Sequence, residues 1–134
     1  MAETQYQKIT SRALRLVRAG GRPNDAWLTT LAEIYPPDNL RSQQKHSCPK
    51  WAFSILCHSG HIKGVTLGCC PESENKSSGR YALDALSHLL ANPSLSTNKA
   101  ELKRKVFGVK GQPGYRTPNG EVEVLLCLQS EIAA

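Results

Sequence analysis

The sequence contains no apolar run long enough to cross a bilayer. Spanning the hydrocarbon core takes about 20 consecutive apolar residues, and no stretch of this 134-residue chain approaches that length. The N-terminal region also lacks the continuous apolar segment of a secretory signal peptide, because Arg12, Arg15 and Arg18 interrupt it. We therefore expect a cytoplasmic protein with no membrane association, whose five cysteines are thiols rather than disulfides.

Common catalytic signatures are absent as well. The sequence has no P-loop, no G-x-G-x-x-G glycine motif, no H-E-x-x-H and no kinase motif. Its acidic residues are dispersed, and none is expected to form a buried catalytic pair. Glu121 and Glu123 stand at the start of the last predicted helix, where negative charge favours the helix dipole. These absences favour a non-enzymatic protein that needs no cofactor and acts by binding.

The charge of the chain is strongly positive, with a net value of +6. Hydrophobic residues make up 40% and charged residues 21%, close to the globular average, which predicts a single folded domain over residues 1–134. The positive charge favours an acidic partner, such as nucleic acid or an acidic protein surface. It argues against a protein that mimics the acidic surface of DNA.

Apolar residues recur at helical spacing in six segments, which predicts an all-α fold. Glycine and proline residues punctuate these segments, as they do at the ends of helices. The expected helices cover residues 5–19, 23–35, 49–59, 80–91, 99–107 and 120–132. The longest irregular stretches are expected at residues 38–47, 61–78 and 108–119.

Two helix starts carry capping signals. Asn98, followed three residues later by Glu101, resembles a capping box. Asn119 is expected to cap the last helix. The helix predicted for residues 49–59 is the most hydrophobic in the chain, and Gly60 is expected to end it.

A weak internal repeat relates the two halves of the sequence. Ile55-Leu56-Cys57 matches Leu125-Leu126-Cys127, and Ile62 matches Ile132 at the same offset. One interpretation is two pseudo-repeated three-helix units packed together, with halves 1–65 and 79–134 joined by loop 66–78. The other is that amphipathic helices of similar length look alike by chance.

Residues 48–64 carry a more specific motif, C-P-x-x-A-F-x-x-L-C-x-x-G-x-x-K-G. Asn75-Lys76 and Tyr81-Ala82-Leu83 follow as a stretched N-K-x-Y-A-L, with residues 77–80 inserted. In these motifs the chain resembles a family of small, uncharacterised bacterial proteins predicted to be helical. The C-terminal half matches loosely. The resemblance implies a compact helical fold and brings no known activity.

Histidine and cysteine are concentrated between residues 46 and 70. The group comprises His46, Cys48, Cys57, His58, His61, Cys69 and Cys70. No C-x2-C pair is present, and one helix would hold Cys48 and Cys57 about 13 Å apart, too far for one zinc ion. A site built from His58 or His61 with Cys69 and Cys70 stays open. We favour buried thiols and surface imidazoles and predict no metal.

Cys48 is a candidate nucleophile, because it precedes Pro49 and is expected at the N-cap of a helix. Helix N-termini stabilise thiolates, and Lys50 and His46 are near in sequence. No catalytic elbow or triad motif accompanies it, so we interpret Cys48 as a small capping residue. Cys57 and Cys127 lie in apolar runs and are expected to be inert core residues.

Two basic clusters and one loop are the candidate partner-binding residues. The first cluster, on the first helix, comprises Lys8, Arg12, Arg15 and Arg18. The second cluster, on the fifth helix, comprises Lys99, Lys103, Arg104 and Lys105. Tyr115 and Arg116 follow in a glycine-rich loop. Such clusters bind phosphates or acidic proteins, although a solvated helix face explains them without any partner.

The leading hypothesis is a small basic binding protein that contacts a protein or ribonucleoprotein complex. By analogy it would suit an inhibitor of a nucleic-acid-processing complex, of the phage counter-defence or anti-CRISPR type. The first alternative is direct DNA or RNA binding. A helix-turn-helix is disfavoured, because the predicted third helix is apolar on nearly every side. The second alternative is a cysteine-dependent enzyme or zinc-binding protein.

Overall fold

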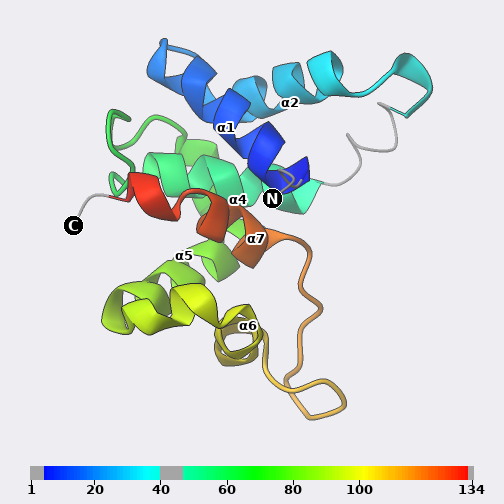
Figure 1. The fold of residues 1–134 in the computed structure, drawn as a ribbon, viewed down its shortest axis with the longest axis vertical. Helices are drawn as coiled ribbons and strands as arrows, with labels where there is room; N and C mark the ends of the chain where they lie inside the picture. The colour runs from blue at the N-terminus through cyan, green and yellow to red at the C-terminus, as the bar shows by residue number, and fades with distance from the viewer. Residues whose placement is uncertain (1–4, 40–46, 133–134) are drawn as a thin grey trace.

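The computed structural model describes residues 5–39 and 47–132, and within those ranges it is all α-helical, as predicted (Figure 1). The α-helices are α1 (Gln5–Arg18), α2 (Pro23–Ile34), α4 (Ser47–His58), α5 (Ser77–Ala91), α6 (Lys99–Phe107) and α7 (Glu121–Cys127). Short 3-10 helices are η1 (Pro71–Asn75), η2 (Pro93–Thr97) and η3 (Gln129–Glu131). None of the helices described is both long and apolar enough to cross a membrane.

Helix α4 forms the centre of the molecule. It packs against α2, α5 and α7, and Figure 1 shows α1 and α2 on one side of it and α5 and α6 on the other. Ala52, Phe53, Leu56 and Cys57 on this helix are completely buried. A helix that is apolar on nearly every side has to be enclosed by others, which explains why this most hydrophobic segment lies innermost.

Helix α1 is amphipathic and packs its apolar face on α2 and α7. Arg18, at the C-terminal end of α1, contacts residues that are distant in sequence. Its guanidinium donates to the carbonyl of Lys63 at 2.7 and 3.0 Å and pairs with the carboxylate of Glu131 at 2.7 Å. Arg18 thereby ties three segments that are distant in sequence.

The six α-helices named above form two consecutive groups, α1, α2 and α4 followed by α5, α6 and α7, in the order that the weak repeat suggests. Helix α1 of the first group packs on α7 of the second, and α5 of the second packs on α4 of the first. The equivalent residues Ile62 and Ile132 pair with each other in an isolated antiparallel bridge. The Lys63 N–H donates to the Glu131 carbonyl beside it, at 2.8 Å. This exchange fits a pseudo-twofold relation, while the division into separate halves remains a prediction.

Three predicted boundaries of α5 and α7 were wrong, and α4 begins at Ser47 rather than at the predicted Pro49. The fourth helix begins at Ser77 rather than at residue 80, and the last one ends at Cys127, with η3 completing the predicted span. The early start of α5 depends on Gly79, where a Cβ would lie 2.9 Å from the Ser73 carbonyl and 3.2 Å from Ile55. The third error is the cap of α7, which is Gly120 and not Asn119.

Other local predictions are confirmed. Asn98 Oδ1 accepts from the Glu101 N–H at 3.2 Å and so caps α6, which ends before Gly108. Residues 108–119 contain turns and no helix. Of the predicted loop 38–47, residues 40–46 lie outside the described residues, and the loop prediction was wrong for residues 38, 39 and 47, which are helical.

Candidate functional site

The basic cluster on α6 is paired with carboxylates. Lys103 lies 2.6 Å and Lys99 3.7 Å from Glu123 Oε2. Arg104 contacts Glu101, and Lys105 lies 4.0 Å from the same carboxylate. Each of the four predicted residues on this helix therefore has an internal counter-charge, which leaves α6 less attractive to an acidic partner.

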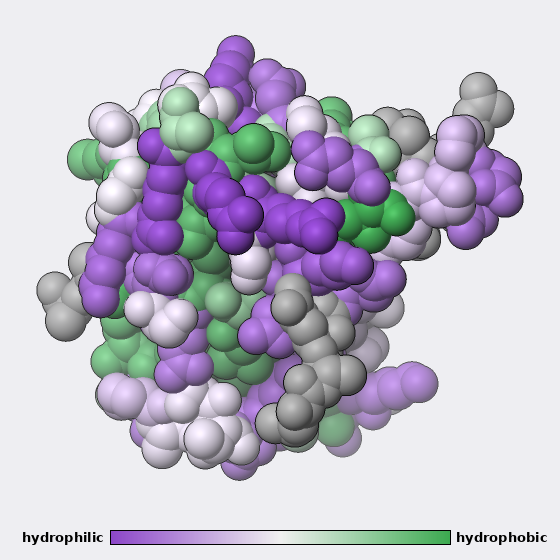
Figure 2. Space-filling model, turned by 45° about the horizontal axis from the view of Figure 1, so that its top comes forward, coloured by the Kyte–Doolittle hydropathy of each residue, from purple (hydrophilic) through white to green (hydrophobic). Residues whose placement is uncertain are grey.

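The basic residues of α1 differ from those of α6. Lys8, Arg12 and Arg15 form no ion pair within residues 5–39 and 47–132, and α1 itself has no acidic residue. Arg12 and Arg15 are exposed and Lys8 is half-buried. Figure 2 turns the α1 and α2 side towards the viewer and shows hydrophilic side chains gathered across this face. We call Lys8, Arg12 and Arg15 the α1 row.

The loop residues do not join the α1 row. Tyr115 is half-buried and Arg116 is exposed, and the Arg116 N–H donates to the Phe107 carbonyl at 2.9 Å. Figure 1 shows the loop that follows α6 at the opposite end of the molecule from α1. The predicted partner-binding residues are thus divided between separate surfaces.

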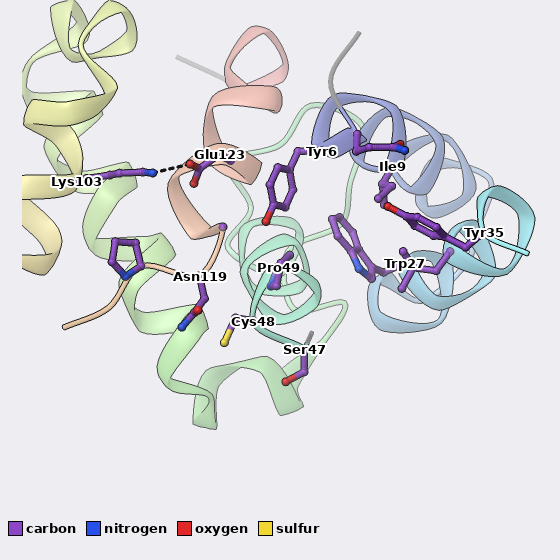
Figure 3. Close-up of a pocket in the computed structure, with 14 residues that line it drawn as sticks. Tyr6, Ile9, Trp27, Tyr35, Ser47, Cys48, Pro49, Lys103, Asn119 and Glu123 are labelled. Carbon is purple, nitrogen blue, oxygen red and sulfur yellow. Dashed lines mark ion pairs between the residues drawn. The ribbon is translucent and has the colours of Figure 1, made fainter. Parts of the chain in front are cut away.

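A pocket of about 680 Å³ opens between α1, α2 and the beginnings of α4 and α7 (Figure 3). Its lining divides into an apolar part and a polar rim. The apolar part includes Tyr6, Ile9, Trp27, Leu31, Tyr35 and Pro49. The polar rim includes Ser47, Cys48, Lys103, Asn119 and Glu123. The exposed surface of the pocket is thus a mixture of polar and apolar groups in a concave setting, which a small ligand with both kinds of group could fill.

Tyr6 and Gly120 fit closely at the inner end of this pocket. Gly120 has a φ of +96°, and a Cβ on it would lie only 2.6 Å from the Tyr6 hydroxyl. Burial raises the pKa of Tyr6, and the carboxylates of Glu123 and Glu121 raise it further. The hydroxyl therefore stays protonated and can both donate and accept hydrogen bonds.

Glu121 is buried, which was not predicted from the sequence. Its side chain is 1% exposed, and its Oε1 accepts from the Asn119 N–H at 2.6 Å. Burial is the main cause of the raised pKa of this carboxyl group. The available signal was its position beside Val122 and Val124, both fully buried. The prediction for Glu121 depended on the helix dipole at the start of α7 alone and took no account of how that turn packs against the core.

We predict that Glu121→Gln stabilises the protein at neutral pH. Because the folded-state pKa is raised, the native protein holds the proton more tightly, and stability falls as pH rises above about 4.5. The amide removes this penalty, so we expect a gain of about 1 kcal/mol at pH 7.5 that disappears near pH 4. Urea denaturation at both pH values measures it. An equal effect at both pH values would contradict the buried, ionising carboxyl, and the exposed Glu33→Gln serves as the control.

Cys48 lies inside the first turn of α4, which begins at Ser47, and not at the predicted N-cap. Its sulfur lines the pocket and is half-buried, while His46 lies outside the described residues. Cys57 is core, as expected, but Cys127 is only half-buried. Burial raises the pKa of both thiols, which favours the unreactive protonated form.

His58 has a structural role in the cysteine- and histidine-rich segment. Its Nδ1 accepts from the Cys70 N–H at 3.1 Å, so Nε2 carries the proton that faces Glu74 at 2.7 Å. Both ring nitrogens are occupied, and burial raises the pKa of the neighbouring Cys69 and Cys70 thiols. Across residues 5–39 and 47–132, no three His, Cys, Asp or Glu side chains are grouped to hold a metal ion.

Comparison with known proteins gives a family and no activity. A family model described as a family of unknown function (DUF6979) matches residues 3–132. The membership in an uncharacterised family that the motifs predicted is thus confirmed. No curated protein and no solved structure matches the chain. Its function has to be argued from its own geometry.

Proposed function

The chain belongs to this family of unknown function, and we propose that it is a small, non-enzymatic binding protein that docks α1 on an acidic partner. The observation that carries the proposal is the α1 row. Arg18 and the basic residues of α6 are paired with carboxylates, whereas Lys8, Arg12 and Arg15 have no such partner in the described chain.

The spacing of the α1 row suits a linear acidic surface. Positions i, i+4 and i+7 lie on one helix face, and at ~1.5 Å rise per residue the row extends about 10 Å. The opposite face of α1 is fixed by Ile9, Ala13 and Val17 in the core. The charges are therefore presented on a rigid element, which favours fast, electrostatically steered association.

A protein or ribonucleoprotein complex is the proposed partner. Base reading by a helix-turn-helix requires a recognition helix that can enter the major groove, and α4, the candidate recognition helix, is enclosed in the core. An inhibitor of a nucleic-acid-processing complex, of the counter-defence type, would need only an acidic contact surface on its target. Direct nucleic-acid binding is the competing outcome of the experiment.

The test is retention of a partner from host lysate, with and without nuclease, by the wild type and by Arg12→Glu/Arg15→Glu. We expect a discrete protein complex that survives nuclease and is lost with the double charge reversal. Arg80→Glu/Lys110→Glu is the matched control, because it changes the charge equally at exposed positions elsewhere. It should retain the partner.

The competing outcomes are distinct. Retention of nucleic acid alone, with an affinity that falls steeply with salt, would replace the proposal by direct DNA or RNA binding. Equal loss of the partner in the test and control variants would show a general charge effect and contradict docking through α1. Thermal unfolding of each variant checks that the fold survives.

A further inference from the structure

The pocket in Figure 3 has an aromatic wall formed by Tyr6, Trp27 and Tyr35. Trp27 is 2% exposed and is supported from behind by Phe53, with ring centroids 5.3 Å apart. Tyr6 and Tyr35 are half-buried, so parts of their side chains remain accessible. Aromatic rings contribute an apolar surface and also attract cations.

One carboxylate, that of Glu123, lines the pocket beside this wall. Glu123 and Lys103 both line the pocket, and the dashed line in Figure 3 marks the ion pair between them. The Oε2 atom of Glu123 pairs with Lys103 at 2.6 Å and with Lys99 at 3.7 Å, whereas its Oε1 is buried and has no hydrogen-bond partner within the described chain. Glu121 is buried nearby, and both carboxyl groups raise the pKa of the Tyr6 hydroxyl.

We infer that this pocket binds an alkylammonium group. The aliphatic chain would lie against Leu31 and the aromatic wall, and the ammonium would donate to the unpaired oxygen of Glu123. The group can come from a free amine or from a lysine side chain of another protein. This site is independent of the α1 row, which attracts the opposite charge.

The experiment uses the fluorescence of Trp27 in a Trp51→Phe background, which leaves Trp27 as the sole tryptophan of the chain. The probes are n-butylammonium chloride, its neutral analogue 1-butanol and its anionic analogue sodium butyrate. We expect a saturable change with n-butylammonium alone. Glu123→Gln should weaken binding about tenfold, because a charged hydrogen-bond acceptor is replaced by a neutral one. Glu33→Gln removes an exposed carboxylate and should leave the affinity unchanged.

A second variant separates ligand binding from the attachment of α6. Glu123→Gln also weakens the contacts with Lys99 and Lys103, whereas Tyr35→Leu keeps those ion pairs and removes one ring from the wall. Both variants should reduce affinity. Equal binding of the three probes, preference for butyrate, or unchanged affinity in both variants would overturn the inference.

Competition identifies the source of the group. The competitor is Nα-acetyl-lysine methylamide. If it displaces n-butylammonium at a similar concentration, the result supports a lysine side chain as the ligand. No displacement at a large excess, with n-butylammonium still bound, supports a free amine. These probe titrations require no protein partner, so their failure would leave the proposal for α1 unaffected.

Discussion

Replacing Phe53 by alanine is expected to lower the free energy of unfolding by about 3–5 kcal/mol, the usual cost of deleting a large buried aromatic side chain. Phe53 is completely buried on the central helix α4 and packs against Trp27 of α2. Its loss would leave a cavity where these two helices meet. Urea denaturation followed by circular dichroism measures the change.

Phe53→Ala should also alter the pocket. Trp27 forms part of the aromatic wall, and without Phe53 its ring would lose the aromatic contact that it makes at a tilt of 40°. We expect weaker n-butylammonium binding in Phe53→Ala under conditions where the variant remains folded. Leu90→Ala is the control, since Leu90 is 47% exposed, and should change stability by less than about 0.5 kcal/mol. A similarly small loss for Phe53→Ala would contradict the central position of α4.

The sequence was sufficient to predict the helices, because their apolar periodicity and their caps are local. The strongest example is α4, whose continuous apolar composition predicted its burial. The signals at Asn98 and Glu101 likewise act over three residues, and the observed cap follows them. The start of α5 was not predicted because glycine has a low helix propensity. In the structure Gly79 is nevertheless helical, and its close packing against Ile55 leaves no room for a side chain at this position.

The candidate site was much less predictable, because it consists of long-range pairs. The sequence did not show which basic residues are paired with carboxylates. Only the fold brings Glu123 to Lys103 and Glu131 to Arg18. The aromatic wall likewise joins Tyr6 to Trp27 from different helices. Ile62 and Ile132, which match at the repeat offset, pair directly in the structure, but the match did not predict this contact and did not distinguish repetition from chance.

Gly120→Ala is expected to destabilise the protein through two separate effects. An alanine at a φ of +96° costs about 1–2 kcal/mol, because its Cβ approaches the backbone in the left-handed region. That Cβ would also lie 2.6 Å from the Tyr6 hydroxyl and 3.1 Å from Pro49. Displacing these groups should bring the total to about 2–4 kcal/mol, measured by urea denaturation.

Gly111→Ala isolates the contact with Tyr6. Gly111 has a similar φ of +88°, yet a Cβ there would meet nothing within 4 Å. It should therefore show the backbone cost alone and leave n-butylammonium binding unchanged, whereas Gly120→Ala should move the Tyr6 ring and weaken binding. Adding Tyr6→Phe to Gly120→Ala removes the hydroxyl that the new methyl meets and should recover part of the lost stability. Equal losses of stability in the two glycine variants, with no recovery on adding Tyr6→Phe, would show that Tyr6 does not pack on the start of α7. The contact that positions the aromatic wall would then be absent.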